Sequence, residues 1–291
     1  KDSWDAIVNE DGLLVEPPVA LVEVQGYAYA ARRAAAGLYR ALQNNELAAK
    51  QDYMADWLRD HFDEVFWMPD KECYCLALDK AKGQAKVISS NAGQVLWTGI
   101  APQQHADAVA ERLMQPDMFT GWGIRTLSSL EKRYNPMGYH IGTVWPHDNS
   151  LIAYGFKRYA QEDKLLRVLS GLFDLASQMP DGRLPELICG YQRIDGEDPV
   201  RYPVACSPQA WASGVFELFL RLMLGLQTDA PNHVLRVVRP RLPGWLRQIT
   251  VTNIPVGNGS VDLACRREGE HTYTEILNVR GDIQVSFVEK W

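Results

Sequence analysis

The sequence predicts a mainly α-helical protein, a double ring of helices followed by a small antiparallel β-domain. Three observations support this prediction. Helices that are apolar on two sides alternate with helices that are apolar on one side, as expected when an inner ring is wrapped by an outer ring. Connections from inner to outer helices are short, whereas those that return to the inner ring are long. After Gln227 the apolar residues begin to alternate, which is typical of strands.

The pattern predicts four inner and three outer helices. The inner helices are expected at residues 19–42, 89–99, 146–159 and 208–226, and the outer helices at residues 46–67, 102–115 and 164–177. Pro17 and Pro18 are expected to open the first helix. Pro146 is expected at the first position of the third inner helix, because the N–H that proline lacks has no partner there anyway.

The long connections cover residues 68–88, 116–145 and 179–207, and each returns to the N-terminal end of an inner helix. Within the first, alternation through Tyr74, Leu76 and Leu78 and a turn at residues 80–83 predict a hairpin. All the long loops therefore gather at one rim. Such a rim on a regular scaffold is where we expect a binding site.

The β-domain is expected at residues 229–291, leaving residues 1–228 for the helical rings. Its strands are predicted at residues 234–238, 249–254, 260–267, 272–279 and 283–288, separated by glycine-rich turns. No residue pattern in this segment indicates chemistry. We interpret it as a structural cap.

Composition excludes several classes of protein. The 291 residues suit one large domain, or one large and one small, and the net charge of −6 is spread without runs. This disfavours nucleic acid or an anionic membrane as a partner. No apolar stretch approaches the ~20 residues of a membrane span. Five cysteines, with no close C-x-x-C pair, predict reduced thiols in a cytoplasmic protein.

Residues 139–149 concentrate hydrogen-bonding and stacking groups directly ahead of an inner helix. Tyr139, His140, Trp145 and His147 are candidate ligand-binding residues, while Asp148 falls in the first helical turn, where a negative charge suits the helix dipole. The structural alternative is that Asp148 caps the helix, Trp145 packs and the histidines are satisfied locally. A metal site built from His140, His147 and Asp148 matches no tight ligand motif. No phosphate loop is present either, so no cofactor or metal is expected.

Acidic residues that stand beside aromatic or apolar neighbours near the predicted rim are candidates for chemistry. Asp2 and Asp5 flank Trp4 before the first inner helix, and Glu186 lies between apolar neighbours in the last long loop. Two carboxyl groups at one rim could act as general acid and base on a glycosidic bond. The alternative is that Asp2 and Asp5 are solvated caps and that Glu186 pairs with Arg183 or Arg193.

Aromatic residues in the loops would supply platforms for stacking on sugar rings. These residues are Trp4, Trp97, Trp122, Tyr139, Trp145, Tyr191 and Tyr202. Glu23 is a carboxylate inside an otherwise apolar helical run, and its burial is costly unless it is paired or hydrogen-bonded. It is either part of a structural ion pair or a ligand for sugar hydroxyl groups, with the second slightly favoured.

Five motifs resemble one family in the order in which they occur. They are KDSWD at residues 1–5, ALVEVQGY at 20–27, YHIGTVWP at 139–146, LPEL at 184–187 and SPQAW at 207–211. The chain resembles the bacterial amylo-α-1,6-glucosidase (glycogen-debranching-like) proteins, which belong with the glucoamylase-like (α/α)6-barrel glycosidases. The resemblance implies an (α/α)6 toroid of which seven of twelve helices are present. It also implies that a barrel segment precedes Lys1.

The resemblance assigns roles to particular residues. Asp2 falls on the family's general acid and Glu186 on its general base, while Trp145 and Pro146 fall beside the sugar. Together with the patterns above, this gives a set of expected substrate-binding residues: Trp4, Asp5, Glu23, Trp97, Tyr139, His140, Trp145, His147 and Trp211.

The sequence therefore predicts an inverting glycosidase acting on the α-glucosidic bonds of an oligo- or polysaccharide. Asp2 would protonate the leaving oxygen and Glu186 would activate a water molecule. Rival readings are another specificity of the same barrel (trehalose, glucosylglycerate or an oligosaccharide) and a non-catalytic sugar-binding or scaffold fragment. Glu186 argues against an inverting phosphorylase, which needs no carboxylate base.

Overall fold

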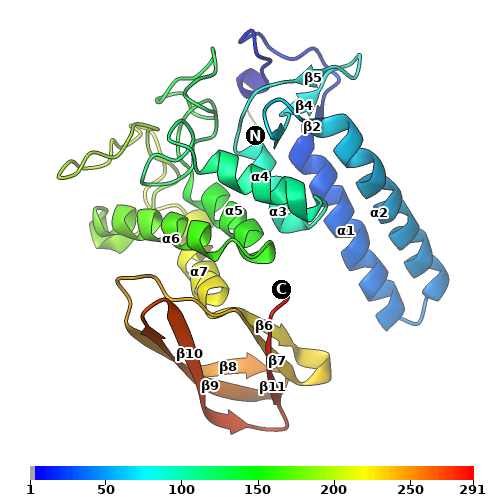
Figure 1. Cartoon of the computed structure of the whole chain (residues 1–291), viewed down its shortest axis with the longest axis vertical. Coiled ribbons are helices and arrows are strands. Elements are labelled where there is room, and N and C mark those ends of the chain that lie inside the picture. Colours follow the sequence, from blue (N-terminus) through cyan, green and yellow to red (C-terminus); the bar gives the residue numbers. More distant parts are fainter. Residues whose placement is uncertain (1–3) are drawn as a thin grey trace.

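The computed structural model describes residues 4–291, in which two layers of α-helices lie above two small sheets (Figure 1). The helices are α1 (Val22–Ala41), α2 (Asn45–Phe66), α3 (Asn91–Thr98), α4 (Gln103–Leu113), α5 (Pro146–Arg158), α6 (Glu162–Ser177) and α7 (Val215–Leu224). Short 3-10 segments occur at Trp4–Ala6, Pro180–Gly182, Trp211–Gly214 and Ala230–Asn232. Pro146 is the first residue of α5, as expected.

The helices form the expected inner and outer layers. Helices α1, α3, α5 and α7 contact one another in that order, while α2, α4 and α6 pack on α1, α3 and α5 respectively. Helices α3 and α5 approach very closely at Gly155. A Cβ atom there would lie 2.4 Å from the Cβ of Leu96 and 2.9 Å from the backbone nitrogen of Trp97. Gly155 thus lets the two helices pack almost backbone to backbone.

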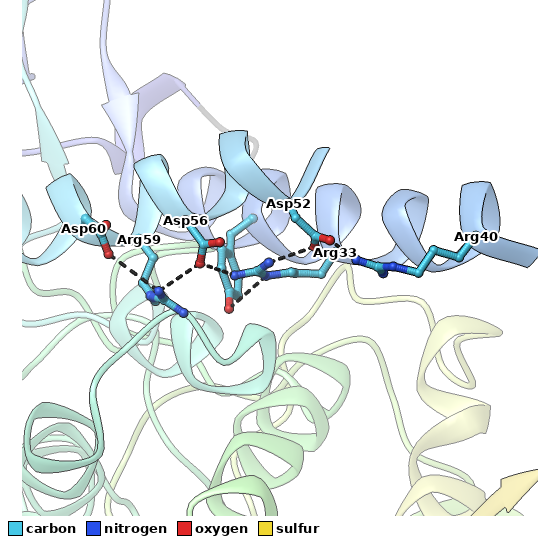
Figure 2. Close-up of polar contacts among 7 residues, drawn as sticks. Arg33, Arg40, Asp52, Asp56, Arg59 and Asp60 are labelled. Atoms are coloured by element: carbon cyan, nitrogen blue, oxygen red, sulfur yellow. Dashed lines mark hydrogen bonds and ion pairs between the residues drawn. The ribbon is translucent and has the colours of Figure 1, made fainter. Parts of the chain in front are cut away.

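Charged side chains join α1 to its outer partner α2 along their length (Figure 2). Arg33 donates to Asp52 at 2.8 Å and also to Asp56, so one guanidinium bridges two turns of α2. The remaining pairs extend this line of alternating charges at both ends: Arg40 with Asp52, and Arg59 with Asp56 and Asp60.

Three inner helices begin later than expected: α3 by two residues, and α1 and α7 by more. Residues Ala20–Leu21 form strand β1, which pairs with β4 (Ala77–Leu78), so α1 starts at Val22 and not directly after the prolines. Before α7, residues Trp211–Gly214 form a 3-10 turn, and residues 208–210 lie outside any helix. Ser213 and Gly214 are poor helix formers, and the Ser213 hydroxyl donates to the backbone oxygen of Ala210 at 2.5 Å.

The first long loop contains the expected hairpin, with a second strand pair beside it. Strand β2 (Trp67–Met68) pairs with β3 (Cys73–Tyr74), and β4 pairs with β5 (Gln84–Ala85) around the expected turn. The expected alternation is wrong, because residues 73–78 are all buried. Strand β4 is enclosed between β1 and β5, and β3 packs on α4. Burial raises the pKa of the free Cys73 and Cys75 thiols to about 12.

The β-domain contains two three-stranded sheets. One has the order β10-β9-β8 and the other β11-β7-β6. The strands are β6 (Leu226–Asp229), β7 (Val234–Val238), β8 (Gln248–Val256), β9 (Gly259–Glu268), β10 (His271–Arg280) and β11 (Gln284–Val288). Two expectations were wrong: β6 was not anticipated, and β11 pairs with β7 in parallel. Strand β6 follows α7 directly after Gly225, at a positive φ of 69°, and is too short to show alternation.

The long loops lie at the end of the helices farthest from the β-domain (Figure 1). This end carries the N-termini of the inner helices, so the predicted asymmetry of the connections is confirmed. Within residues 4–291 every helix is too short or too polar to span a bilayer.

Candidate active site

A cavity of about 340 Å³ opens at the N-terminal ends of the inner helices. Each inner helix, or the loop before it, contributes to its wall. The principal lining residues are Glu23 and Tyr27 from α1, Ser90, Asn91 and Gln94 at the start of α3, His140, Trp145, His147 and Asp148 at the start of α5, and Trp211 ahead of α7. The cavity is therefore a feature of the ring as a whole.

The floor of the cavity is a network of buried polar side chains. Asn91 donates through Nδ2 to Glu23 at 2.7 Å. Gln94 donates through Nε2 to a carboxylate oxygen of Asp148, and its own side-chain oxygen accepts from the Tyr27 hydroxyl at 3.1 Å. Burial, with the negative charges of Glu23 and Asp148 nearby, raises the pKa of Tyr27. Tyr27 therefore remains a neutral donor between two carboxylates.

Aromatic rings form another wall. The Trp145 indole N–H donates to the backbone oxygen of Tyr139 and to the Thr143 hydroxyl, both at 3.0 Å, which fixes the ring. The His140 ring stacks on Trp145 with centroids 5.0 Å apart. His147 stacks on Trp211 at 4.2 Å, and Trp211 is 68% exposed at the rim. Aromatic rings beside a few placed polar groups are the usual composition of a pocket that binds a small molecule.

Glu186 lies next to this wall but does not line the cavity. Its side chain is buried, and one oxygen accepts from the Tyr139 hydroxyl while the other accepts from the backbone N–H of Cys206 at 3.0 Å. The Tyr139 ring in turn packs edge-on against Trp145 at 4.7 Å. The alternative pairing with Arg193 is wrong, because Arg193 pairs with Asp174 at 2.6 Å.

The loop that carries Tyr139 and the loop that carries Glu186 are joined through their backbones. Val144 and Ile188 exchange two hydrogen bonds of 3.0 Å. Gly190 packs against Gly142 so closely that a Cβ atom at Gly190 would lie 1.7 Å from the Gly142 oxygen. The position of Glu186 is thus fixed relative to the aromatic wall.

The structure brings together only part of the expected substrate-binding set. Glu23, His140, Trp145, His147 and Trp211 line the cavity. Tyr139 instead donates to Glu186. Asp5 and Trp97 are half-buried and do not line the cavity. The Trp97 ring packs against the Tyr27 ring, with centroids 5.7 Å apart. Asp2 and the side chain of Trp4 lie outside the described residues.

Sequence reasoning missed Tyr27, Asn91 and Gln94, and it treated Asp148 only as a cap or metal ligand. A signal for each was present. Tyr27 follows Glu23 by one helical turn, which puts the two on one face of α1. Asn91 and Gln94 are polar residues in a short, otherwise apolar helix. Within residues 4–291, no group of three or more His, Cys, Asp or Glu side chains is arranged to hold a metal ion.

Comparison with solved structures first defines the class of protein. The chain is similar to a GH63 mannosylglycerate hydrolase from Thermus thermophilus (19% identity, TM-score 0.55, covering 69% of this chain and 45% of that one). It is also similar to a neutral trehalase from Saccharomyces cerevisiae (14% identity, TM-score 0.56, covering 70% of this chain and 38% of that one). A third similar structure is a GH78 rhamnosidase from Bacillus sp. GL1 (15% identity, TM-score 0.65, covering 92% of this chain and 26% of that one). The fold is therefore part of an (α/α)6 glycosidase barrel with a β-domain, and the chain spans under half the length of these three structures.

Residues 3–189 match the model of the mannosylglycerate hydrolase MGH1-like glycoside hydrolase domain, and the chain belongs to this family. No curated protein matches the sequence significantly. The resemblance to (α/α)6 glycosidases is thereby confirmed, whereas the finer assignment to the amylo-α-1,6-glucosidases remains a prediction.

Proposed function

We propose that the protein is an inverting glycoside hydrolase that cleaves α-glucosidic bonds in an oligo- or polysaccharide. Asp2 would donate a proton to the leaving oxygen, and Glu186 would remove a proton from the attacking water molecule. The sugar ring would occupy the cavity between the aromatic wall and the Glu23 network. This reaction needs neither a cofactor nor a metal ion.

The observation that carries the proposal is the setting of Glu186. The Glu186 carboxylate is buried and accepts a hydrogen bond at each oxygen. Its loop is hydrogen-bonded to the loop that carries the aromatic wall of the cavity. These contacts give the carboxylate the fixed orientation that a base requires. Tyr139 donates to Glu186 and packs edge-on against Trp145, so it connects Glu186 to the wall of the described cavity.

A second candidate is the same chemistry on another small glycoside. The family model is named for mannosylglycerate hydrolase, and a trehalase shares the fold, so mannosylglycerate, glucosylglycerate and trehalose are the alternative substrates. In a purely sugar-binding protein, Glu186 would serve only to hold Tyr139 and the backbone of Cys206.

Turnover by the intact parent protein tests the proposal. We expect hydrolysis of at least one member of a panel of maltose, isomaltose, glycogen, trehalose and mannosylglycerate. Glu186→Gln keeps one acceptor oxygen for the backbone N–H of Cys206 and presents an amide N–H to the Tyr139 hydroxyl, which can also accept. It should lower kcat by roughly 10²–10⁴-fold. Wild-type turnover by Glu186→Gln would show that Glu186 is not the base. Inactivity of the wild type on the whole panel would contradict the proposed hydrolase activity.

A further inference from the structure

Thr143 is a fully buried threonine in the loop ahead of α5, and its hydroxyl lies between two aromatic residues of the site. The hydroxyl donates to the backbone oxygen of Tyr139 at 2.5 Å. It also accepts from the indole N–H of Trp145 at 3.0 Å. Thr143 itself does not line the cavity. An effect of its hydroxyl on a bound sugar therefore passes through these two neighbours.

The chemistry of the partners fixes the direction of both hydrogen bonds. An indole N–H can only donate and a carbonyl oxygen can only accept. The single hydroxyl proton therefore points to Tyr139, while an oxygen lone pair receives the N–H of Trp145. The indole N–H also donates to the same Tyr139 oxygen at 3.0 Å. The three groups form a closed triangle, in which the Thr143 hydroxyl joins the backbone of Tyr139 to the ring of Trp145.

The two neighbours of Thr143 lead to different parts of the site. The side-chain hydroxyl of Tyr139 donates to Glu186, the proposed base. Trp145 lines the cavity, and the ring of His140 stacks on it. One threonine hydroxyl thus holds both the residue that meets the proposed base and a ring of the cavity wall.

The backbone of Thr143 is held independently of its side chain. Its backbone oxygen accepts from the N–H of Thr126 at 2.9 Å, and the next residue, Val144, exchanges two hydrogen bonds of 3.0 Å with the last long loop. A change that removes only the hydroxyl should leave this backbone in place. The Tyr139 oxygen and the Trp145 N–H also keep each other as partners, so neither is left unsatisfied.

We propose that Thr143 is a positioning residue, which sets kcat through Tyr139 and Glu186 and sets sugar affinity through Trp145. The inference rests on the proposed function, because it takes Glu186 to be the base. Without the hydroxyl, the Tyr139 backbone and the Trp145 ring lose their common anchor. The effects on kcat and on KM then arise through different neighbours, and kinetics can separate them.

Steady-state kinetics of Thr143→Val in the intact parent protein test the proposal first. Valine replaces the hydroxyl with a methyl group of similar size. The loss of a neutral hydrogen bond predicts a roughly threefold to tenfold fall in kcat and a rise in KM of the same order. Thr143→Ser keeps the donor and acceptor and should hold both constants within about twofold of wild type. Thr143→Ala, which also lacks the hydroxyl, gives the same reading if valine does not fit.

A double-mutant cycle with Tyr139→Phe separates the two routes. Tyr139→Phe already removes the contact with Glu186, so adding Thr143→Val should cause no further fall in kcat. The rise in KM should persist in the double mutant, because Trp145 is unchanged. An equal fall in kcat in both backgrounds would show that Thr143 does not act through the Tyr139 hydroxyl, and would overturn the inference.

Thr98→Val is the matched control for a structural role. Thr98 is also a buried threonine, but it ends α3 and its hydroxyl donates to the Val95 oxygen of the same helix at 2.6 Å. Its substitution should leave kcat and KM unchanged even if it lowers the melting temperature. The same outcome for Thr143→Val would assign Thr143 a purely structural role and overturn the inference.

The indole N–H signal of Trp145 reports on the triangle without any substrate. In NMR spectra of protein with isotope-labelled tryptophan, this signal is identified by its absence from Trp145→Phe. It should move in Thr143→Val and stay in place in Thr143→Ser. Hydrolysis by the wild type with an unmoved signal in Thr143→Val would overturn the inference alone. Inactivity of the wild type on all substrates, with a signal that moves, would overturn the proposed function and leave Thr143 as the anchor of Trp145.

Discussion

At the scale of single residues, Tyr139 makes a contact that the sequence pattern did not indicate. The sequence predicts that Tyr139 binds substrate, because it lies in an aromatic loop at the rim. In the structure its hydroxyl donates to Glu186, and its ring packs between Trp145 and Tyr202. Spacing along the chain could not show this contact, because the two residues are joined only through the pairing of two long loops.

Tyr139→Phe should therefore change turnover more than binding. Removing a hydroxyl that donates to a carboxylate costs about 1.5–3 kcal/mol, so kcat should fall roughly tenfold to hundredfold. KM should stay within about twofold, because Phe keeps the ring packing. Steady-state kinetics of the parent protein check this. A raised KM at constant kcat would show instead that Tyr139 contacts the substrate directly.

Lys157 is a residue that no sequence pattern marks as unusual. It is fully buried on α5, donates to the backbone oxygen of Arg239 at 2.6 Å and pairs with Glu162 at 3.2 Å. Burial lowers the pKa of Lys157 from its ordinary 10.5 to about 8, although Glu162 opposes the change. The lysine thus links the helical ring to the β-domain at the residue that follows β7.

This shift predicts a pH dependence of stability. Because the folded pKa is below the unfolded one, the unfolded chain binds more protons between about pH 8 and 10.5, and stability due to Lys157 rises through that window. The difference in unfolding free energy between wild type and Lys157→Met should move by about 2 kcal/mol in favour of wild type from pH 7.5 to 10. Urea unfolding at both pH values measures it. A pH-independent difference would show that Lys157 keeps its ordinary pKa.

At the scale of elements, the helices were largely predictable and the strand pairing was not. The alternation of two-sided and one-sided helices reflects burial, which acts on each helix separately, so a local pattern suffices. The parallel pairing of β11 with β7 depends on segments about 50 residues apart, which no local pattern encodes. The 3-10 turn before α7 was missed because Ser213 and Gly214 interrupt an apolar run without breaking its period.

The ion pairs between α1 and α2 are a second feature set by pairs of elements. Arg33 bridges Asp52 and Asp56 with its side chain 30% exposed (Figure 2). Arg33→Met should lower the unfolding free energy by about 1 kcal/mol at low ionic strength, and by less in 1 M salt, because partly exposed pairs are screened. Thermal unfolding at two salt concentrations checks this, with the exposed Lys50→Met as control. A loss independent of salt would assign the contribution of Arg33 to packing on Tyr29.

At the scale of the whole molecule, the candidate site is shared among all four inner helices. The sequence predicts a site at the rim of long loops, and the cavity lies at that rim. Loop length and helix direction are both readable from local patterns. The floor network could not be read in this way. It joins α1, α3 and α5, whose residues come together only when the ring forms.

Both edges of the partial ring are hollowed. A cavity of about 430 Å³ lies between α1 and α2, where Tyr53 and Trp57 are largely exposed. Another of about 580 Å³ lies beside the start of α7, near Phe216. The expected preceding barrel segment, which would cover such surfaces, stays a prediction, as does the role of Asp2.

The stereochemistry of the first product tests the central claim most directly. A base that delivers water from the face opposite the acid inverts the anomeric carbon, so the first sugar released from an α-glucoside by the parent protein is the β-anomer. Proton NMR of the anomeric signals in the first minutes of hydrolysis, before mutarotation, measures this. If Glu186 acts as the base of a single displacement, we expect an initial excess of the β-anomer that decays toward equilibrium. An initial excess of the α-anomer would contradict it, because Glu186 could not then be the base of a single displacement.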